Sequence, residues 1–316
     1  MATWKPIVAG VDGSPQAAGA AALAWRIAGT AGTDCYFVHG AHPLLYAPAV
    51  ADFMTDADAL VDRQVESARA QVVAALRDAL PPLAQNRVDV RLGRAAAVVV
   101  HAAHECNAGL IVLGGKHHST LGRWMGGSTA QHVVRTTDIP LLVTGSRPGP
   151  ITRILVAADL SYAVRPTFEA AARMARLFGA ELRVLHAVEP LPVFAEMPMV
   201  LDDAAFYDDS RQQFERCLEP LLEQVPAQAV LRRGHAADAL AAEAAEWGAD
   251  LVAVGAHGKG WVDRLLMGST TERLLDQLPA SLLVIPVPPP AGERRPGRAV
   301  RRARLARQRA AGGTVL

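Results

Sequence analysis

The chain has 316 residues, about twice the length of a typical domain of roughly 150 residues, so two domains are the expected organisation. Hydrophobic residues make up 51% and charged residues 20%, a composition that fills sizeable cores and excludes a mainly disordered chain. The formal net charge is +1, but residues 291–316 hold eight arginines against one glutamate (8 − 1 = +7), which leaves −6 for residues 1–290 (1 − 7). The near-neutral total therefore combines an acidic body with a basic tail.

The cysteines and the first residues indicate the compartment. Cys35, Cys106 and Cys217 are far apart and form no CxxC pair, so no disulfide framework is expected and a reducing environment is favoured. The chain starts without the basic and apolar segments of a secretory signal, and it has no run of about 18 apolar residues. We therefore expect a cytoplasmic protein.

Short runs rich in Val, Ile and Leu alternate with longer Ala-rich segments throughout the chain. The first half predicts strands over 6–11, 34–39, 88–92, 110–114 and 140–144, separated by helices over 15–29, 65–80, 96–106 and 128–136. The second half predicts strands over 154–157, 181–186, 229–232, 250–254 and 281–285.

The two halves repeat each other. Asp12 recurs as Asp159 at an offset of 147, and Gly114 recurs as Gly255 at an offset of 141. A constant offset on each side of one break indicates a duplicated domain with a six-residue length difference, which we place in the segments 41–62 and 188–209. The expected domains are therefore 1–146 and 151–288, followed by a basic tail over 289–316 that we expect to be disordered.

The order of the expected elements defines the fold class. Strands such as 251–254 are continuously apolar, which is typical of a parallel sheet covered on both faces. Five alternating strand and helix units per half predict two tandem doubly wound α/β domains, each with a five-stranded parallel sheet flanked by helices. Ligands of such sheets bind beyond the carboxyl ends of the strands, where the strand order reverses. Polar and glycine signals follow strands 1 and 4 of each half, so we expect a site there.

The segment after the strand over 250–254 carries the strongest functional signal. It contains Gly255, Gly258 and Gly268 and opens a helix at Ser269 and Thr270. Glycines let the backbone approach a ligand closely, and the unpaired N–H groups at a helix N-terminus attract anions such as phosphate. The spacing matches neither the Walker A loop nor the dinucleotide GxGxxG. The segment therefore predicts a phosphate site of another kind.

At these residues the chain resembles the universal stress protein family in its tandem two-domain form, over roughly residues 3–287. The ATP-binding variant of that family has Gly-x2-Gly-x9-Gly-Ser/Thr after strand 4, which Gly255, Gly258, Gly268 and Ser269 match at every position. The resemblance implies an adenine nucleotide alpha hydrolase-like fold, ATP as the ligand and a stress-response or regulatory role. Mg²⁺ accompanying ATP would bind mainly through phosphate oxygens.

The resemblance also implies roles for single residues, and each role has a structural alternative. Asp159 would contact the ribose, or else cap the next helix. The backbone of Ala187 would meet adenine. Ser269 and Thr270 would hold phosphate or serve as an unoccupied helix cap. Lys259 and Arg264 would add positive charge near the phosphates or remain solvated.

The first half departs from the motif. Its corresponding positions are Asp12, Gly40, Gly114, Gly127 and Ser128, but His117 replaces the second glycine. An imidazole adds bulk where the backbone should approach the ligand, although Gly115 beside it offers some slack. We therefore expect a weaker nucleotide site in this half, and two unequal sites in the molecule.

Other chemistry is less well supported by the sequence. His101 and His104 share a helix face, but no Cys or carboxylate completes a metal set, and the second half has no copy of the pair. No nucleophile–base pair and no arginine finger stands out, so any ATP hydrolysis is expected to be slow.

The remaining expectations concern partners. In the universal stress protein family the final strands of paired domains often meet across a two-fold, so the resemblance implies an internal pseudo-dimer through strands 141–143 and 282–285, and further a homodimer of the whole chain. An unknown protein partner would read the nucleotide-bound form. The basic tail is either solvated or a salt-sensitive contact for nucleic acid or an anionic surface. A weak ATPase and a nucleotide-independent interaction scaffold remain the alternative functions.

Overall fold

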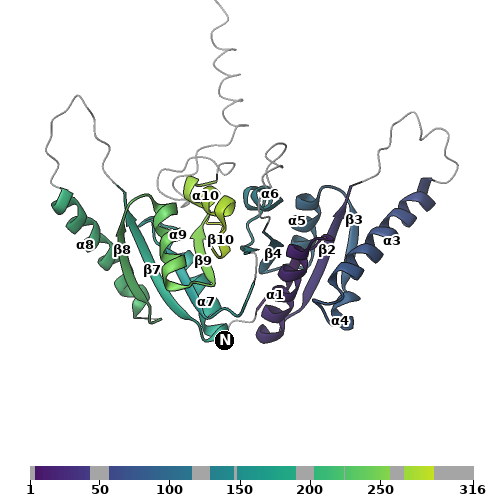
Figure 1. The fold of residues 1–316 in the computed structure, drawn as a ribbon, viewed down its shortest axis with the longest axis horizontal. Helices are drawn as coiled ribbons and strands as arrows, with labels where there is room; N and C mark the ends of the chain where they lie inside the picture. The colour runs from purple at the N-terminus through teal and green to yellow at the C-terminus, as the bar shows by residue number, and fades with distance from the viewer. Residues whose placement is uncertain are drawn as a thin grey trace, which may run out of the picture.

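The computed structural model describes residues 4–42, 57–115, 129–145, 148–189, 203–223, 225–256 and 267–287. These residues form a single ten-stranded sheet in the order β3-β2-β1-β4-β5-β10-β9-β6-β7-β8. Figure 1 shows the two domains side by side, with β3 and β8 toward the outer ends and β10 near the middle, where it neighbours β5 in the sheet order. The expected α/β class is confirmed, and the order within each half is that of a doubly wound sheet.

The first domain alternates strands with helices along the chain. Within it, β1 pairs in parallel with β2 and β4, β2 with β3, and β4 with β5. Its elements are β1 (Ile7–Gly10), α1 (Pro15–Ala31), β2 (Cys35–Ala41), α3 (Ala57–Leu76), α4 (Pro82–Gln85), β3 (Val88–Leu92), α5 (Ala95–Glu105), β4 (Leu110–Gly114), α6 (Thr129–Thr136) and β5 (Leu141–Thr144).

The second domain repeats this arrangement, and every expected strand of the chain is present to within two residues at either end. Its strands are likewise parallel to one another. Its elements are β6 (Arg153–Ala157), α7 (Val164–Phe178), β7 (Glu181–Val188), α8 (Asp203–Leu222), β8 (Gln228–Arg233), α9 (Ala236–Trp247), β9 (Leu251–Gly255), α10 (Ser269–Gln277) and β10 (Ser281–Ile285).

Two apolar layers cover the sheet, one on each face, and each runs through both domains. Helices α1, α3, α7 and α8 contribute to one layer, with Phe37, Phe168 and Phe214 among its buried residues. Helices α5, α6, α9 and α10 contribute to the other. Successive strand residues point to opposite faces, so a strand such as β9 must be apolar at every position, as its sequence predicts.

One prediction about the repeat is wrong. The helices α3 and α8 are offset by 146 residues (203 − 57), whereas Val88 of β3 and Ala229 of β8 occupy equivalent sheet positions at an offset of 141. Most of the length difference therefore lies after α3, where α4 has no counterpart among the described residues between α8 and β8. The helix expected over 65–80 also begins earlier and ends at Leu76. Residues 77–80 form turns and a bend after the helix, and Pro81 disfavours helical backbone at Leu80, so the helix does not continue to residue 80.

The expected pairing of the two final strands is present, and it is the only antiparallel pairing described in the sheet. Leu142 lies opposite Leu283, which is its own counterpart in the repeat, so a pseudo-two-fold axis passes between them. Leu141 faces Val284, and Val143 faces Leu282 in the same ladder. The two domains thus meet as an internal pseudo-dimer with an interface of matching surfaces.

Helices α6 and α10 extend this interface with the same symmetry. Gln131 contacts Asp276 at 3.3 Å, and Arg135 contacts Glu272 at 3.5 Å. In the repeat, Gln131 corresponds to Glu272 and Arg135 corresponds to Asp276. The pseudo-two-fold axis therefore relates the Gln131–Asp276 contact to the Arg135–Glu272 contact. Both contacts are exposed and each adds little stability, so the strand pairing and the apolar layers contribute most to this interface.

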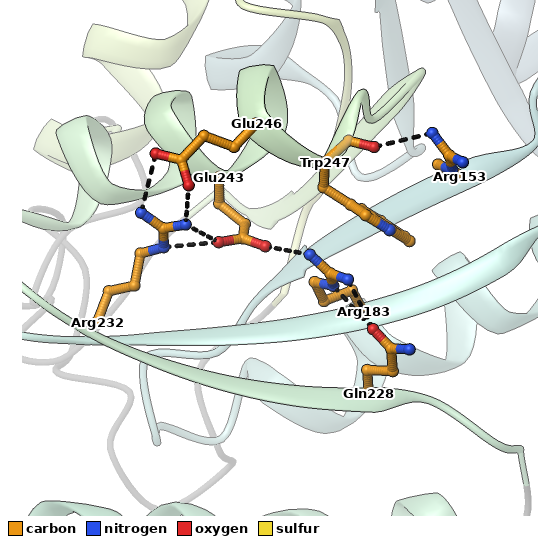
Figure 2. Close-up of polar contacts among 7 residues, drawn as sticks. All are labelled: Arg153, Arg183, Gln228, Arg232, Glu243, Glu246 and Trp247. Carbon is orange, nitrogen blue, oxygen red and sulfur yellow. Dashed lines mark hydrogen bonds and ion pairs between the residues drawn. The ribbon is translucent and has the colours of Figure 1, made fainter.

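The second domain also contains an ion-pair network between β7, β8 and α9 (Figure 2). The Glu243 side chain is 3% exposed and accepts hydrogen bonds from Arg183 at 2.5 Å and from Arg232 Nε at 2.6 Å. Arg232 also binds Glu246, and these hydrogen bonds lower the pKa of the exposed Glu246 carboxyl. Arg183 in addition lies over the Trp247 ring, 4.3 Å from its centroid.

Candidate functional site

A cavity of about 530 Å³ lies in the second domain, beyond the carboxyl ends of β6, β7 and β9. Residues of α7 and α8 line it on one side of the sheet, and residues of α9 and α10 line it on the other. Strand order reverses here, because β6 connects outward to β7 while β9 lies on its other side. This is the position at which doubly wound sheets bind ligands.

The loop after β6 is organised by Asp159. Its Oδ1 accepts hydrogen bonds from the Ser161 amide at 3.0 Å and the Ser161 hydroxyl at 2.7 Å. The Ser161 hydroxyl oxygen in turn accepts from the Ala163 amide at 3.1 Å, just before α7. Asp159 therefore stabilises the helix start through Ser161 and also lines the cavity, where it is only partly buried. A structural role of Asp159 at the start of α7 is therefore compatible with a second role in binding a ligand.

Residues at the end of β7 form part of the cavity wall. His186 lies 2.7 Å from the Ala158 carbonyl oxygen through Nδ1. Because a carbonyl can only accept, this nitrogen carries the proton. The ring packs against Phe214 of α8, with centroids 5.6 Å apart. His39 makes the same contact with the Val11 carbonyl at 2.8 Å, so this histidine has a repeated structural role and His186 also lines the cavity.

The N-terminus of α10 forms the other end of the cavity. The helix starts after Gly268 and has no side-chain cap, in contrast to α1, whose Ser14 accepts from the Ala17 amide. Gly268 donates to the Ala256 carbonyl at 3.0 Å, and the Thr271 hydroxyl donates to the Gly255 carbonyl at 2.8 Å. These bonds hold the start of the helix against the end of β9. The first amides of an uncapped helix attract an anion.

The structure brings together the predicted second-domain residues that it describes. The cavity is lined by Asp159, Ala187, Gly255, Gly268, Ser269 and Thr270. Gly258, Lys259 and Arg264 lie outside the described residues.

Sequence reasoning missed the contribution of α7 and α8. Thr167, Phe206, Ser210 and Gln213 line the cavity, and none belongs to the glycine motif or follows a strand. The apolar periodicity of α8 shows which face packs on the sheet, but it does not show which residues border a cavity near the helix start.

In the first domain, two of the predicted site glycines have a packing role. A Cβ on Gly114 would lie 2.8 Å from the carbonyl carbon of Gln16, because the start of α1 crosses the end of β4 there. A Cβ on Gly40 would lie 2.7 Å from the Ala95 Cα. Asp12 binds the Ser14 amide at 2.9 Å, as Asp159 binds Ser161. Gly127, Ser128 and His117 lie outside the described residues.

Gly115 does not provide the expected slack. A Cβ there would lie 2.3 Å from the Thr144 carbonyl oxygen and 2.4 Å from Cδ1 of Leu278 in the second domain. The residue is therefore small because the domain interface closes over it. Its counterpart is Ala256, so the two domains differ at this point.

Cysteines and histidines add no further site among the described residues. No group of three or more His, Cys, Asp or Glu side chains in the described part could hold a metal ion. His101 and His104 are exposed and lie near Glu105 and Asp138, respectively. Burial raises the pKa of the Cys35 thiol to about 12, so it stays protonated and unreactive at neutral pH.

Fold and cavity together define a two-domain doubly wound α/β protein with a ligand-sized cavity at the switch point of its second sheet. The model of the universal stress protein family matches residues 3–145 and 150–286. The chain therefore belongs to the universal stress protein family and contains two tandem domains of that family.

Individual relatives agree with this assignment. A universal stress protein of Thermus aquaticus is 31% identical over 133 residues, which cover 42% of this chain and 96% of the relative. A universal stress protein A homolog of Coxiella burnetii is 27% identical over 137 residues, covering 42% of this chain and 93% of the relative. Both relatives thus correspond to a single domain.

A solved universal stress protein structure from Archaeoglobus fulgidus matches both domains. Its TM-score is 0.61 at 18% identity, and the match covers 89% of this chain and 98% of that one. A second structure, from Pseudomonas aeruginosa, has a TM-score of 0.57 at 16% identity and covers 90% and 93% of the two chains. At these identities the likeness concerns the fold. Among the described residues, no helix is long and apolar enough to cross a membrane.

Proposed function

We propose that the second domain binds ATP and that the protein is a nucleotide-dependent regulator of a stress response. The observation that carries the proposal is the lining of the cavity. It combines an uncapped helix N-terminus at Ser269 and Thr270 with a carboxylate at Asp159. A nucleotide has a ribose next to its phosphates, and these two features could bind the two groups. The helix end would bind phosphates, with Mg²⁺ held mainly by their oxygens, and Asp159 would accept from the ribose hydroxyls through Oδ2.

The chemistry of the cavity supports binding more than turnover. Asp159, the carboxylate at the end of β6, uses Oδ1 to hold Ser161. Binding alone can act as a signal if ATP favours one conformation of the protein and a partner binds that conformation. The thiols and the family resemblance favour a cytoplasmic location for this role. The weak ATPase remains the second candidate, since aligned phosphates and Mg²⁺ lower the barrier to hydrolysis by themselves.

The proposal is tested by calorimetric titration of the full chain with MgATP. We expect saturable binding that Gly268→Asp abolishes, because a carboxylate would be placed at the phosphate position, and that Asp159→Ala weakens. Asp12→Ala is the matched variant in the first domain. It should leave binding to the second domain unchanged and weaken only the lower-affinity binding expected in the first domain. Absence of binding at millimolar ATP would contradict the proposal and favour the nucleotide-independent scaffold. If the wild-type protein hydrolyses ATP over multiple turnovers and both Gly268→Asp and Asp159→Ala lose this activity, the result would favour the ATPase.

A further inference from the structure

The cavity has a polar side that the glycine motif does not explain. We call it the α7–α8 side, and it consists of Thr167, His186, Phe206, Ser210 and Gln213. Ser210 is 8% exposed and His186 is 9% exposed, so both polar side chains are largely withdrawn from solvent. Gln213 is anchored by a hydrogen bond from its Nε2 to Asp209 at 2.8 Å. This side lies across the sheet from α10, on the face that α7 and α8 cover.

Thr167 is the unusual residue of this group. The residue is among those that line the cavity, it is 1% exposed, and its hydroxyl oxygen has no hydrogen-bond partner in the structure. A buried hydroxyl without a partner lowers stability, which is why such groups are rare in folded proteins. The corresponding residue of the first domain is Ala20, which has no hydroxyl to satisfy and is fully buried. At this position the second domain therefore bears a cost in stability that the first domain avoids.

The order of the strands assigns an occupant to the α7–α8 side. The sheet order β9-β6-β7 places the phosphate position at α10, Asp159 next to it after β6, and the β7 end beyond Asp159. A nucleotide with its phosphates at Ser269 and its ribose at Asp159 must direct its base toward the end of β7. There Phe206 and the His186 ring offer aromatic surface, and Thr167 offers a hydroxyl that can donate or accept.

We propose that Thr167 is a specificity-determining residue whose hydroxyl forms a hydrogen bond with the purine base of the bound nucleotide. The inference rests on the proposed function and extends it to the recognition of the base. A ring nitrogen or the exocyclic amino group of the base supplies the missing partner of the hydroxyl. The cost of the unpaired group in the free protein is then recovered only when a base of the right hydrogen-bonding pattern is bound.

The test is Thr167→Val, which replaces the hydroxyl by a methyl group of similar shape. Thr144→Val is the matched control, because Thr144 carries the other buried hydroxyl without a partner among the described residues and lies outside the cavity lining. Both variants should keep or raise the melting temperature of the free protein. Thr167→Val should weaken the binding of ATP and of adenosine by the same factor, roughly three- to tenfold, and Thr144→Val should leave both affinities unchanged.

The outcomes separate this inference from the proposed function. If the wild-type protein binds neither ATP nor adenosine, the proposed function fails and the inference fails with it. If it binds both and Thr167→Val retains the wild-type affinities, the proposed function stands and the inference is wrong. Weakening of ATP alone would place the hydroxyl at the phosphates rather than the base and would also overturn the inference.

Discussion

Glu243 occupies the position at which the first domain has Ala102, and it carries a negative charge between two arginines in a nearly inaccessible site. Removing one member of a buried ion pair leaves the opposite charge without compensation. We predict that Glu243→Ala lowers the free energy of unfolding by about 3 kcal/mol, because Arg183 and Arg232 would each lose a buried carboxylate partner. Denaturant unfolding of the full chain measures the loss.

Two variants control for this prediction. Glu246→Ala removes an exposed partner of Arg232 and should cost much less, because solvent screens that pair. Adding Arg183→Tyr, the residue at the equivalent Tyr36, to Glu243→Ala should recover part of the loss, since one uncompensated charge disappears. An equal loss for Glu243→Ala and Glu246→Ala would contradict the interpretation.

Gly114 tests whether a motif glycine serves packing or ligand binding. The start of α1 leaves no room for a Cβ on Gly114, so we predict that Gly114→Ala lowers the free energy of unfolding by about 1 to 3 kcal/mol without any ligand present. Gly29→Ala is the control within α1, where no atom lies within 4 Å of the added carbon, and it should stabilise by about 0.5 to 1 kcal/mol. Thermal unfolding of the ligand-free protein distinguishes the two. An unchanged melting temperature for Gly114→Ala would contradict the packing role and leave ligand binding as the reason for a glycine at this position.

At the scale of elements, the sequence predicts the strands better than the helices that flank them. A strand such as β9 is buried on both faces and must be apolar throughout, which the sequence displays directly. The first residues of α3 are rich in Ala and Asp and show no apolar period, so the start of the helix cannot be located from the pattern. The helix α4 is one turn long, with Pro81 before it and Pro82 as its first residue, and such a short element leaves no periodic signal.

The candidate site was predictable where it depends on strand ends and on the glycine motif. Asp159, Gly255 and Ser269 follow strands or open a helix, and these positions determine their location in a doubly wound sheet. Thr167 was not predictable, because a threonine on an apolar helix face usually bonds to the carbonyl four residues before it. Only the packing of α7 against β6 and β9 shows that its hydroxyl lacks a partner.

At the scale of the whole molecule, the duplication has produced one sheet rather than two separate domains. The β5–β10 ladder joins the halves at Leu142 and Leu283, and both apolar layers continue across it. Helix α10 begins at the cavity and contacts α6 of the first domain through Glu272 and Asp276. A ligand that moved the start of α10 would therefore act directly on the interface between the two domains.

The continuity of the sheet predicts that the covalent link between the domains is dispensable once the protein has folded. A protease site inserted between β5 and β6, after Arg147, allows the folded chain to be cut. We expect the two fragments to co-elute at the mass of the intact chain, because the strand ladder and the two apolar layers bury a continuous interface. Elution as separate fragments would show that the linker holds the domains together. Leu142→Lys combined with Leu283→Lys places like charges on the pseudo-two-fold axis and should release the fragments after cleavage, while circular dichroism checks that each remains folded.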